Sequence, residues 1–290
     1  LKVIFLGIVE GITEWLPISS TGHMILVDEF LKLNVTEDFK NLFFVVIQLG
    51  AILAVVVLYW SKLWPFHRKR IPQRSWFAQQ STNGFVGGLQ RFGDRYCCMD
   101  KIVMWLKIAV SCLPAMLIGL PLNDWLDKHF YNPTVVALML LLYGAGFLFV
   151  ERYNRSRKPR VNSIAALRWS DALLIGVFQV LALIPGTSRS GATILGGILI
   201  GTSREVAAEY TFFLAVPVMF GASLLKIVKF GAISGTELGV LLVGMAVAFG
   251  VSILAIRFLM GYIRKHDFTA FGWYRIGLGL LVLLYFYVIR

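Results

Sequence analysis

Charged residues are scarce in this sequence, and acidic ones most of all. Asp, Glu, Lys and Arg make up 15% of the 290 residues, whereas a soluble domain carries roughly 25%. The shortage excludes an ordinary water-soluble globular protein. Cysteine is also rare: Cys97, Cys98 and Cys112 are the only three, and they form neither a disulfide framework nor a zinc-ligand pattern.

Apolar residues are abundant instead, at 58% of the chain. Several apolar stretches approach or reach the ~20 residues that a helix needs to cross a bilayer. They predict an all-α integral membrane protein, with residues 1–290 forming a single polytopic domain. The predicted spans are 42–60, 102–122, 134–150, 210–228, 238–258 and 271–289.

The basic residues are clustered beside these stretches. Residues 62–101 hold eight Lys and Arg against two Asp, and residues 152–168 hold six and no acid. Such clusters are typical of topology determinants and of contacts with anionic lipids. The net charge of +12 therefore predicts the lipid bilayer, and no nucleic acid, as the partner. We expect 62–101 to be a basic cytoplasmic loop.

Two further apolar segments, 1–33 and 169–201, are interrupted by Pro, Gly and Ser. One helix of that length would measure roughly 50 Å, too long for a ~30 Å hydrocarbon core. A helical hairpin broken at 17–22, or at 185–191, fits better. If each hairpin returns to the side it came from, the basic loops and the cluster at 264–266 share one side. The positive-inside rule thus favours six full transmembrane helices plus two re-entrant helical hairpins.

The two broken segments resemble each other. Glu10 precedes Pro17 much as Gln179 precedes Pro185, and each proline leads into a Ser/Thr/Gly-rich turn and an apolar half-helix. The similarity continues into the next span and predicts internal repeats at about 1–61 and 169–229. Three spans separate the hairpins, so the copies form an inverted-topology repeat whose breaks meet near the midplane.

Glu10 and Glu14 are four residues apart, which places both carboxylates on one helix face. Their flanks are apolar, and acids inside a membrane are costly and usually functional. Two neighbouring carboxylates share a proton or bind a cation. Oxygen ligands suit hard cations, so Glu10 and Glu14 are candidate ligands of Mg²⁺ or Ca²⁺. General acid/base work without a metal is the alternative.

The turn from Ser19 to His23 combines hydroxyls with the start of a half-helix, which is a ready anion site. Ser19, Ser20, Thr21 and Gly22 are candidate phosphate contacts. A lone His on an apolar face is more often a hydrogen-bonded core group, but the neighbouring hydroxyls, glycine and two Glu favour a functional role. His23 is a candidate general base activating Ser20 or water, or a direct nucleophile.

Arg189 is a guanidinium within an apolar stretch and needs an anionic partner. Its planar fork suits phosphate. The same turn supplies further candidate phosphate contacts, namely Gly186, Ser188, Ser190 and Thr193. A purely structural Arg189–Glu14 ion pair is the alternative interpretation.

These motifs resemble those of the undecaprenyl-diphosphate phosphatases of the bacitracin-resistance (BacA/UppP) type. The resemblance covers nearly the whole chain and rests on the runs Glu10-Gly11-Ile12-Thr13-Glu14-Trp15-Leu16-Pro17-Ile18-Ser19-Ser20-Thr21-Gly22-His23 and Pro185-Gly186-Thr187-Ser188-Arg189-Ser190-Gly191-Ala192-Thr193. Residues 67–98 depart from the family's usual shorter Lys/Glu loop.

The resemblance implies hydrolysis of undecaprenyl diphosphate to undecaprenyl phosphate and inorganic phosphate, recycling the lipid carrier of peptidoglycan synthesis and conferring bacitracin resistance. It implies a divalent cation and a multi-pass protein of the bacterial inner (plasma) membrane, its active site facing the external, periplasmic side. A homodimer is an arrangement that the sequence leaves open. By analogy, Glu10, Glu14, His23 and Arg189 carry activity, and Ser20 and Ser188 contact phosphate. The resemblance does not say which residue attacks phosphorus, so the catalytic candidates Ser20 and His23 stay rival nucleophiles.

A secondary transporter or flippase of a polyprenyl phosphate lipid is the alternative function, because inverted repeats with broken helices are a transporter architecture.

Overall fold

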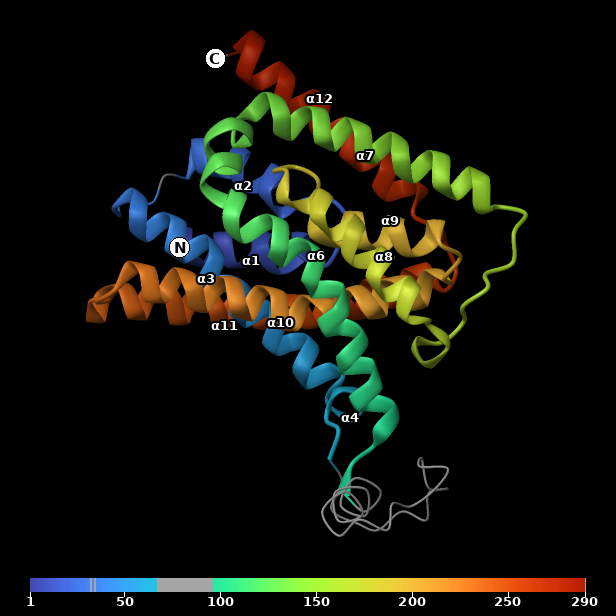
Figure 1. Cartoon of the computed structure of the whole chain (residues 1–290). Coiled ribbons are helices and arrows are strands. Elements are labelled where there is room, and N and C mark those ends of the chain that lie inside the picture. The colour runs from blue at the N-terminus through green and yellow to red at the C-terminus, as the bar shows by residue number, and fades with distance from the viewer. Residues whose placement is uncertain (32, 34, 67–95, 290) are drawn as a thin grey trace.

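The computed structural model describes residues 1–31, 33, 35–66 and 96–289 (Figure 1). Within these ranges the regular structure is helical, with only two isolated β-bridges. Most of the predicted cytoplasmic loop 62–101, and most of the atypical stretch 67–98, lie outside the described residues.

Six helices of the described chain are long and apolar enough to cross a membrane, and each covers all or most of one predicted span. The protein is therefore a multi-pass membrane protein, as predicted. The six are α3 (Glu37–Leu58), α6 (Met99–Phe130), α7 (Pro133–Asn154), α10 (Arg204–Phe230), α11 (Gly235–Ile263) and α12 (Thr269–Leu284), the last continued by a π-helical turn at Tyr285–Ile289.

Several helices begin before the apolar run that predicted them, because polar residues cap them. The Thr36 hydroxyl accepts a hydrogen bond from the backbone N–H of Phe39 at the start of α3. Ser203 caps α10 in the same way, and Ser234 forms a capping box with Glu237 at the start of α11. Such caps satisfy N–H groups of the first turn that have no intrahelical partner. Because these first turns are polar, the apolar stretches in the sequence begin several residues after the helices do.

Both broken segments form pairs of half-helices that pack on each other, α1 (Lys2–Thr13) with α2 (Ser20–Phe30) and α8 (Trp169–Val180) with α9 (Arg189–Leu199). A single 3-10 turn, Leu181–Leu183, extends α8. The breaks overlap the predicted ones but end earlier: the first spans residues 14–19 rather than 17–22, and the second 184–188 rather than 185–191. Serine side chains cap α2 and α9, so the predicted turn residues that follow are already helical.

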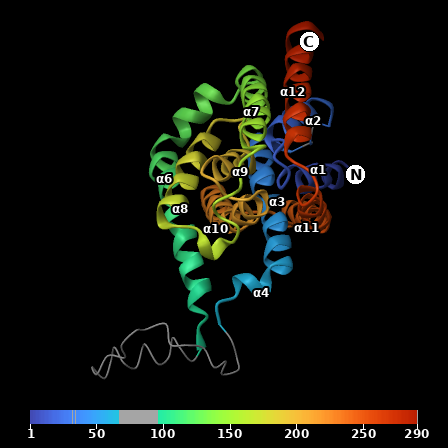
Figure 2. The same cartoon turned by 90° about the vertical axis from the view of Figure 1, so that its right-hand side faces the viewer.

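Each pair of half-helices packs against a long helix from the other half of the chain. α1 lies on α11, and α8 lies on α6. Small residues allow the close approach: a Cβ on Gly7 would lie 2.9 Å from the carbonyl oxygen of Gly244, and one on Gly176 would lie 2.4 Å from that of Ser111. In Figures 1 and 2 the half-helices lie between the α7–α12 pair and the helices α10 and α11.

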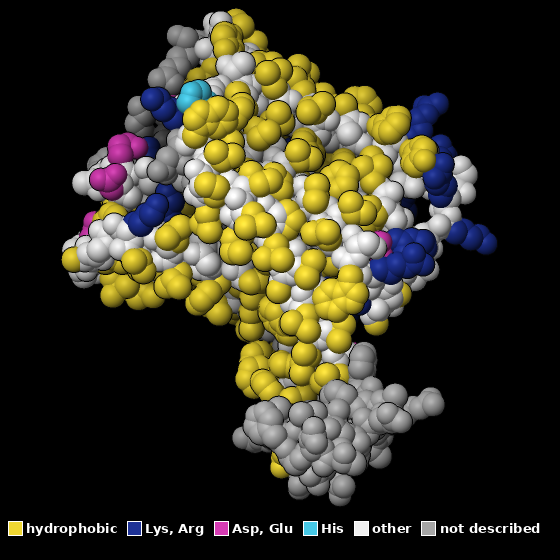
Figure 3. Space-filling view, viewed as in Figure 1, with side chains coloured by type: hydrophobic (Ala, Val, Ile, Leu, Met, Phe, Trp, Pro, Cys, Tyr) yellow, Lys and Arg dark blue, Asp and Glu magenta, His cyan; other side chains and the backbone are white. Residues whose placement is uncertain are grey.

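The surface is that of a membrane protein. Apolar side chains cover most of the face in Figure 3. Lys and Arg gather most densely at the end where the α7–α8 connection lies, and the opposite end shows most of the visible Asp and Glu together with some Lys and Arg. Leu117, Phe149 and Leu254, on three different spans, are each about two-thirds exposed. An apolar belt between polar ends matches the hydrocarbon core of a bilayer.

Candidate active site

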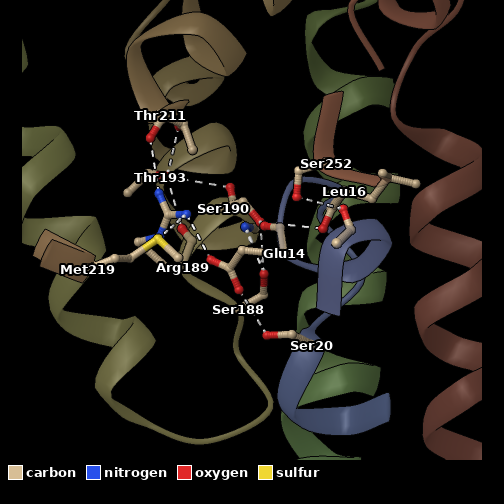
Figure 4. A network of polar contacts seen from close by, with 12 residues as sticks. Glu14, Leu16, Ser20, Ser188, Arg189, Ser190, Thr193, Thr211, Met219 and Ser252 are labelled. Atoms are coloured by element: carbon tan, nitrogen blue, oxygen red, sulfur yellow. Dashed lines mark hydrogen bonds and ion pairs between the residues drawn. The ribbon is translucent and has the colours of Figure 1, made fainter. Parts of the chain in front are cut away.

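The two breaks meet through one buried ion pair. Glu14 follows the last residue of α1, and Arg189 is the first residue of α9. The Nη2 atom of Arg189 donates to Oε1 of Glu14 at 2.9 Å (Figure 4). The side chain of Arg189 is only 12% exposed and that of Glu14 only 9%. Two candidate residues that lie 175 positions apart in the sequence are thus in direct contact.

The rest of the Arg189 guanidinium is only partly engaged. Nη1 donates to the carbonyl oxygen of Thr211 at 3.0 Å, and Nη2 also approaches the Met219 sulfur at 3.4 Å. The guanidinium carbon lies 5.7 Å from the centre of the Trp15 ring. Nε is buried and has no hydrogen-bond partner among the described residues. The Nε–H of the Arg189 guanidinium can therefore still donate to an acceptor on a ligand.

Ser20 is hydrogen-bonded to the other oxygen of the same carboxylate. Its Oγ donates to Oε2 of Glu14 at 3.1 Å, so Glu14 lies between the guanidinium and the serine hydroxyl. A hydroxyl aimed at a carboxylate is the arrangement that activates an oxygen nucleophile. The sequence had offered His23 as the partner of Ser20, and the structure places Glu14 in that position.

Three more of the predicted residues, Ser188, Ser190 and Thr193, form hydrogen bonds within or between the two breaks. The Ser190 hydroxyl lies 3.1 Å from the carbonyl oxygen of Glu14 and 3.4 Å from that of Leu16. The Thr193 hydroxyl donates to the carbonyl oxygen of Arg189 at 2.9 Å. The hydroxyls of Ser188 and Ser190 lie 3.1 Å apart. Ser190 and Thr193 are buried and bonded to backbone, so their visible role is to hold the ion pair in place.

Ser19 and Ser188 occupy equivalent positions, just before α2 and α9. Both have positive φ, 73° and 70°, a conformation that side chains other than glycine rarely adopt. Their hydroxyls accept hydrogen bonds from the N–H groups of Gly22 and Gly191, at 3.3 and 3.2 Å. Strained backbone of this kind concentrates at functional sites, and here it recurs at both breaks.

The remaining predicted phosphate contacts are less central. Gly186 has a φ of 92°, and a Cβ there would lie 2.6 Å from the carbonyl oxygen of Val136, so the tight turn alone requires glycine. Thr21 makes no side-chain hydrogen bond with any described residue.

Glu10 lies one turn before Glu14 and is almost fully buried, at 2% exposed. The side chains of Glu14 and Gln48 approach its carboxyl group, while its Oε1 has no partner in the described structure. An unpartnered carboxylate oxygen beside a second carboxylate and an amide fits a hard divalent cation. No group of three His, Cys, Asp or Glu is gathered anywhere in the described ranges, so such a cation would draw further oxygen ligands from hydroxyls, water or substrate.

His23 points away from the ion pair. Its Nδ1 lies 2.7 Å from the carbonyl oxygen of Ser19, and its Nε2 lies 2.8 Å from the hydroxyl of Tyr274 on α12. The structure therefore keeps His23 on the same half-helix as Ser20 but does not bring it into contact with Glu14 or Arg189.

Arg275 is a residue that the sequence analysis missed. It is fully buried in α12, and its guanidinium donates to the carbonyl oxygens of Pro17 at 3.2 Å, Gly186 at 2.9 Å and Thr187 at 2.8 Å. It therefore binds both breaks at once. The rule that identified Arg189, a lone guanidinium in an apolar run, applies equally to Arg275.

Unpaired polar atoms concentrate around these breaks. Buried polar groups in proteins nearly always have partners, yet the described structure leaves four here without one, besides the Nε of Arg275: Glu10 Oε1, Trp15 Nε1, Thr187 Oγ1 and Arg189 Nε. A polar ligand bound between the breaks would satisfy such groups.

Two cavities of the described structure lie elsewhere. Each has a volume of about 480 Å³; one is apolar and lies beside Trp60 and Trp105, and the other is polar and lies beside Lys62 and Lys107. Neither includes Glu14 or Arg189. The contacts and burial of its residues, and neither of these cavities, therefore mark the site.

Comparisons with known proteins show the family of the chain. Residues 3–281 match the family model described as Bacitracin resistance protein BacA. The chain is 57% identical to the undecaprenyl-diphosphatase of Acetivibrio thermocellus, over 100% of this chain and 98% of the relative. It is 56% identical to undecaprenyl-diphosphatase 1 of Clostridium acetobutylicum, with the same coverage. The undecaprenyl-diphosphatase of Enterococcus faecalis is 55% identical over 98% of this chain and 96% of its own length.

Replacing Arg275 by Met tests whether it joins the breaks. Met keeps the apolar stem but leaves three carbonyls without their donor, so we expect a loss of about 2–4 kcal/mol of stability. Thermal unfolding in detergent measures it. The control is Arg257→Met, at an exposed position of α11, which should leave the unfolding temperature within about one degree of wild type. Equal unfolding temperatures for the two variants would show that Arg275 does not hold the two breaks together.

Proposed function

The chain belongs to the bacitracin resistance protein BacA family, and from that premise we propose how its two breaks act on their substrate. The protein is a membrane phosphatase that hydrolyses undecaprenyl diphosphate to undecaprenyl phosphate and inorganic phosphate. This reaction recycles the lipid carrier for peptidoglycan synthesis and underlies bacitracin resistance. The relatives carry the names of hydrolases, so a transporter or flippase is not favoured.

The observation that carries the site assignment is the buried contact between Glu14 and Arg189. We assign phosphate binding to Arg189, whose free Nε and partly shared Nη2 can turn to a phosphate oxygen, and to the N-termini of α2 and α9. Unpaired N–H groups and the helix dipole favour an anion at such ends. The guanidinium then stabilises the charge that develops in the transition state.

Ser20 is the nucleophile that the geometry favours. Its proton passes to Glu14 as Oγ bonds to the terminal phosphorus, and the bridging P–O bond breaks to release undecaprenyl phosphate. Water then attacks the phosphoserine, the Oγ–P bond breaks, Ser20 regains the proton from Glu14, and inorganic phosphate leaves. Ser20 already donates to the carboxylate that would accept its proton. His23 has no comparable contact with a carboxylate in the described structure.

His23 is three residues after Ser20 on α2, so the two side chains lie on neighbouring positions of one helix face. We assign to His23 the second step, in which it accepts a proton from the attacking water through Nε2. Nε2 is the accepting nitrogen because Nδ1 faces the Ser19 carbonyl, and the attacking water would take the place of the Tyr274 hydroxyl that contacts Nε2 in this structure.

Glu10 and Glu14 are the residues that would hold a divalent cation, Mg²⁺ or Ca²⁺. Their donor set fits a hard cation, and the unpartnered Oε1 of Glu10 supports the assignment. Such a cation supplies neutralisation of charge on the diphosphate.

The membrane arrangement that we propose is an inverted repeat with two re-entrant hairpins. Three likenesses between the halves support it: the positive-φ serine caps, the crossed packing of α1 on α11 and α8 on α6, and unpartnered buried oxygens on Glu10 and Gln179. The Lys and Arg at one end of Figure 3 support a cytoplasmic position for that end. The bacterial inner membrane and an external, periplasmic active site complete the proposal. A homodimer stays a prediction.

The ion pair is tested by removing either charge. Glu14→Gln or Arg189→Ala should lower phosphate release from purified protein by roughly a thousandfold or more, with the protein still folded by thermal unfolding. Glu205→Gln and Arg264→Ala change an exposed ion pair and should keep wild-type turnover. Near-wild-type turnover in Glu14→Gln or Arg189→Ala would show that the site is assigned wrongly.

The attacking group is tested by trapping the intermediate. Acid quenching after mixing with substrate labelled at its terminal phosphate should leave label on the wild-type protein and none on Ser20→Ala. In His23→Ala the label should accumulate, because its hydrolysis is slowed. Label retained by Ser20→Ala, or label found on His23, would contradict attack by Ser20.

The cation is tested by chelation. EDTA should abolish phosphate release, and excess Mg²⁺ or Ca²⁺ should restore it. Glu10→Gln should require a higher cation concentration for half-maximal activity, since one charged ligand is lost. Full activity in EDTA would exclude an exchangeable cation role for Glu10 and Glu14.

A further inference from the structure

Tyr274 on α12 reaches into the site from a third part of the chain. Its hydroxyl lies 2.8 Å from Nε2 of His23. The two rings are nearly parallel, with centroids 5.6 Å apart and an angle of 10° between their planes. Tyr274 is about half exposed, so burial alone does not account for its orientation.

The contacts of His23 determine which nitrogen carries the proton. A carbonyl oxygen only accepts hydrogen bonds, so the 2.7 Å contact with the Ser19 carbonyl requires a proton on Nδ1. In the neutral ring Nε2 is then the acceptor, and the Tyr274 hydroxyl donates to it. The imidazole is held at both nitrogens, and a ring flip would break both bonds.

The position of Tyr274 is itself well defined. The next residue, Arg275, is fully buried and donates to the carbonyls of both breaks. This contact fixes the place of α12 relative to the half-helix that carries His23. The Tyr274 hydroxyl is therefore presented to Nε2 by the same helix that binds the two breaks.

Resting on the proposed role of His23, we infer that Tyr274 is a positioning residue for the reaction. Its hydroxyl donates to Nε2 and holds the ring in one orientation. Water takes the place of this hydroxyl during turnover and donates to the same nitrogen. The Ser19 carbonyl sets the tautomer through Nδ1, a recurrent device in enzyme sites, and Tyr274 holds the other end of the ring.

The first test is Tyr274→Phe, which keeps the stacked ring and removes only the hydroxyl. We expect kcat to fall roughly tenfold, a part of what a positioned acid/base group contributes, with KM within about twofold of wild type. The matched control is Tyr287→Phe in the π-helical turn that follows α12, where the hydroxyl bonds to Thr134 instead. It should leave both constants unchanged.

The second test is a double-mutant cycle with His23→Ala. If the Tyr274 hydroxyl acts through His23, it has no imidazole to position in the His23→Ala variant. Adding Tyr274→Phe to that variant should therefore lower kcat no further. A hydroxyl that merely stabilises the helix would cost the same in either background.

A third measurement needs no turnover. Diethyl pyrocarbonate acylates the free lone pair of imidazole, and the chain has three other histidines, His67, His129 and His266. With these replaced by Asn, Tyr274→Phe should make His23 react several-fold faster, because Nε2 loses its donor.

The outcomes separate this inference from the function on which it rests. Wild-type kcat in Tyr274→Phe, an equal loss in the His23→Ala background, or an unchanged acylation rate would overturn the inference alone. Wild-type turnover in His23→Ala would overturn the assigned role of His23, and the role of Tyr274 with it.

Discussion

The rest of the structure depends on the contact between Glu14 and Arg189. A carboxylate or a guanidinium buried alone in an apolar protein is strongly unfavourable, and pairing the two with further hydrogen bonds offsets the cost. Each charge lies at the broken end of a half-helix, so the pairing forces the two breaks together. The Ser190 hydroxyl and the Arg275 guanidinium join the same two segments through backbone carbonyls, and α11 and α6 hold the half-helices from outside.

Under the proposed function this pair is structural and functional at once, so the structural ion pair and the phosphate site that the sequence offered as alternatives share one geometry. Before substrate binds, Glu14 neutralises Arg189 and accepts from Ser20. In the proposed reaction a diphosphate competes with Glu14 for the guanidinium, and the released carboxylate is a stronger acceptor for the serine proton. Donors held in place before the substrate arrives need no rearrangement in the transition state, which is the main source of electrostatic catalysis.

Much of this was accessible from the sequence. Apolar runs located the six spans, since a bilayer dictates length and composition, and intramembrane charge located Glu14 and Arg189. Helix ends were misplaced where polar residues such as Thr36 and Ser234 cap the first turn. Arg275 and Tyr274 were missed because they lie inside an uninterrupted span, with no Pro or Gly break to direct attention to them. His23 was found, but its partner was not.

The sequence by itself determined the class of protein, the positions of the breaks and the residue types gathered there, because these follow from local composition and from the backbone preferences of Pro, Gly and Ser. Only the tertiary structure decided which side chains meet. Ser20 bonds to Glu14, and His23 to Tyr274, 251 positions away. Such contacts depend on the crossing and rotation of packed helices, which are set by side chains along their whole length and leave no local signal at the residues concerned.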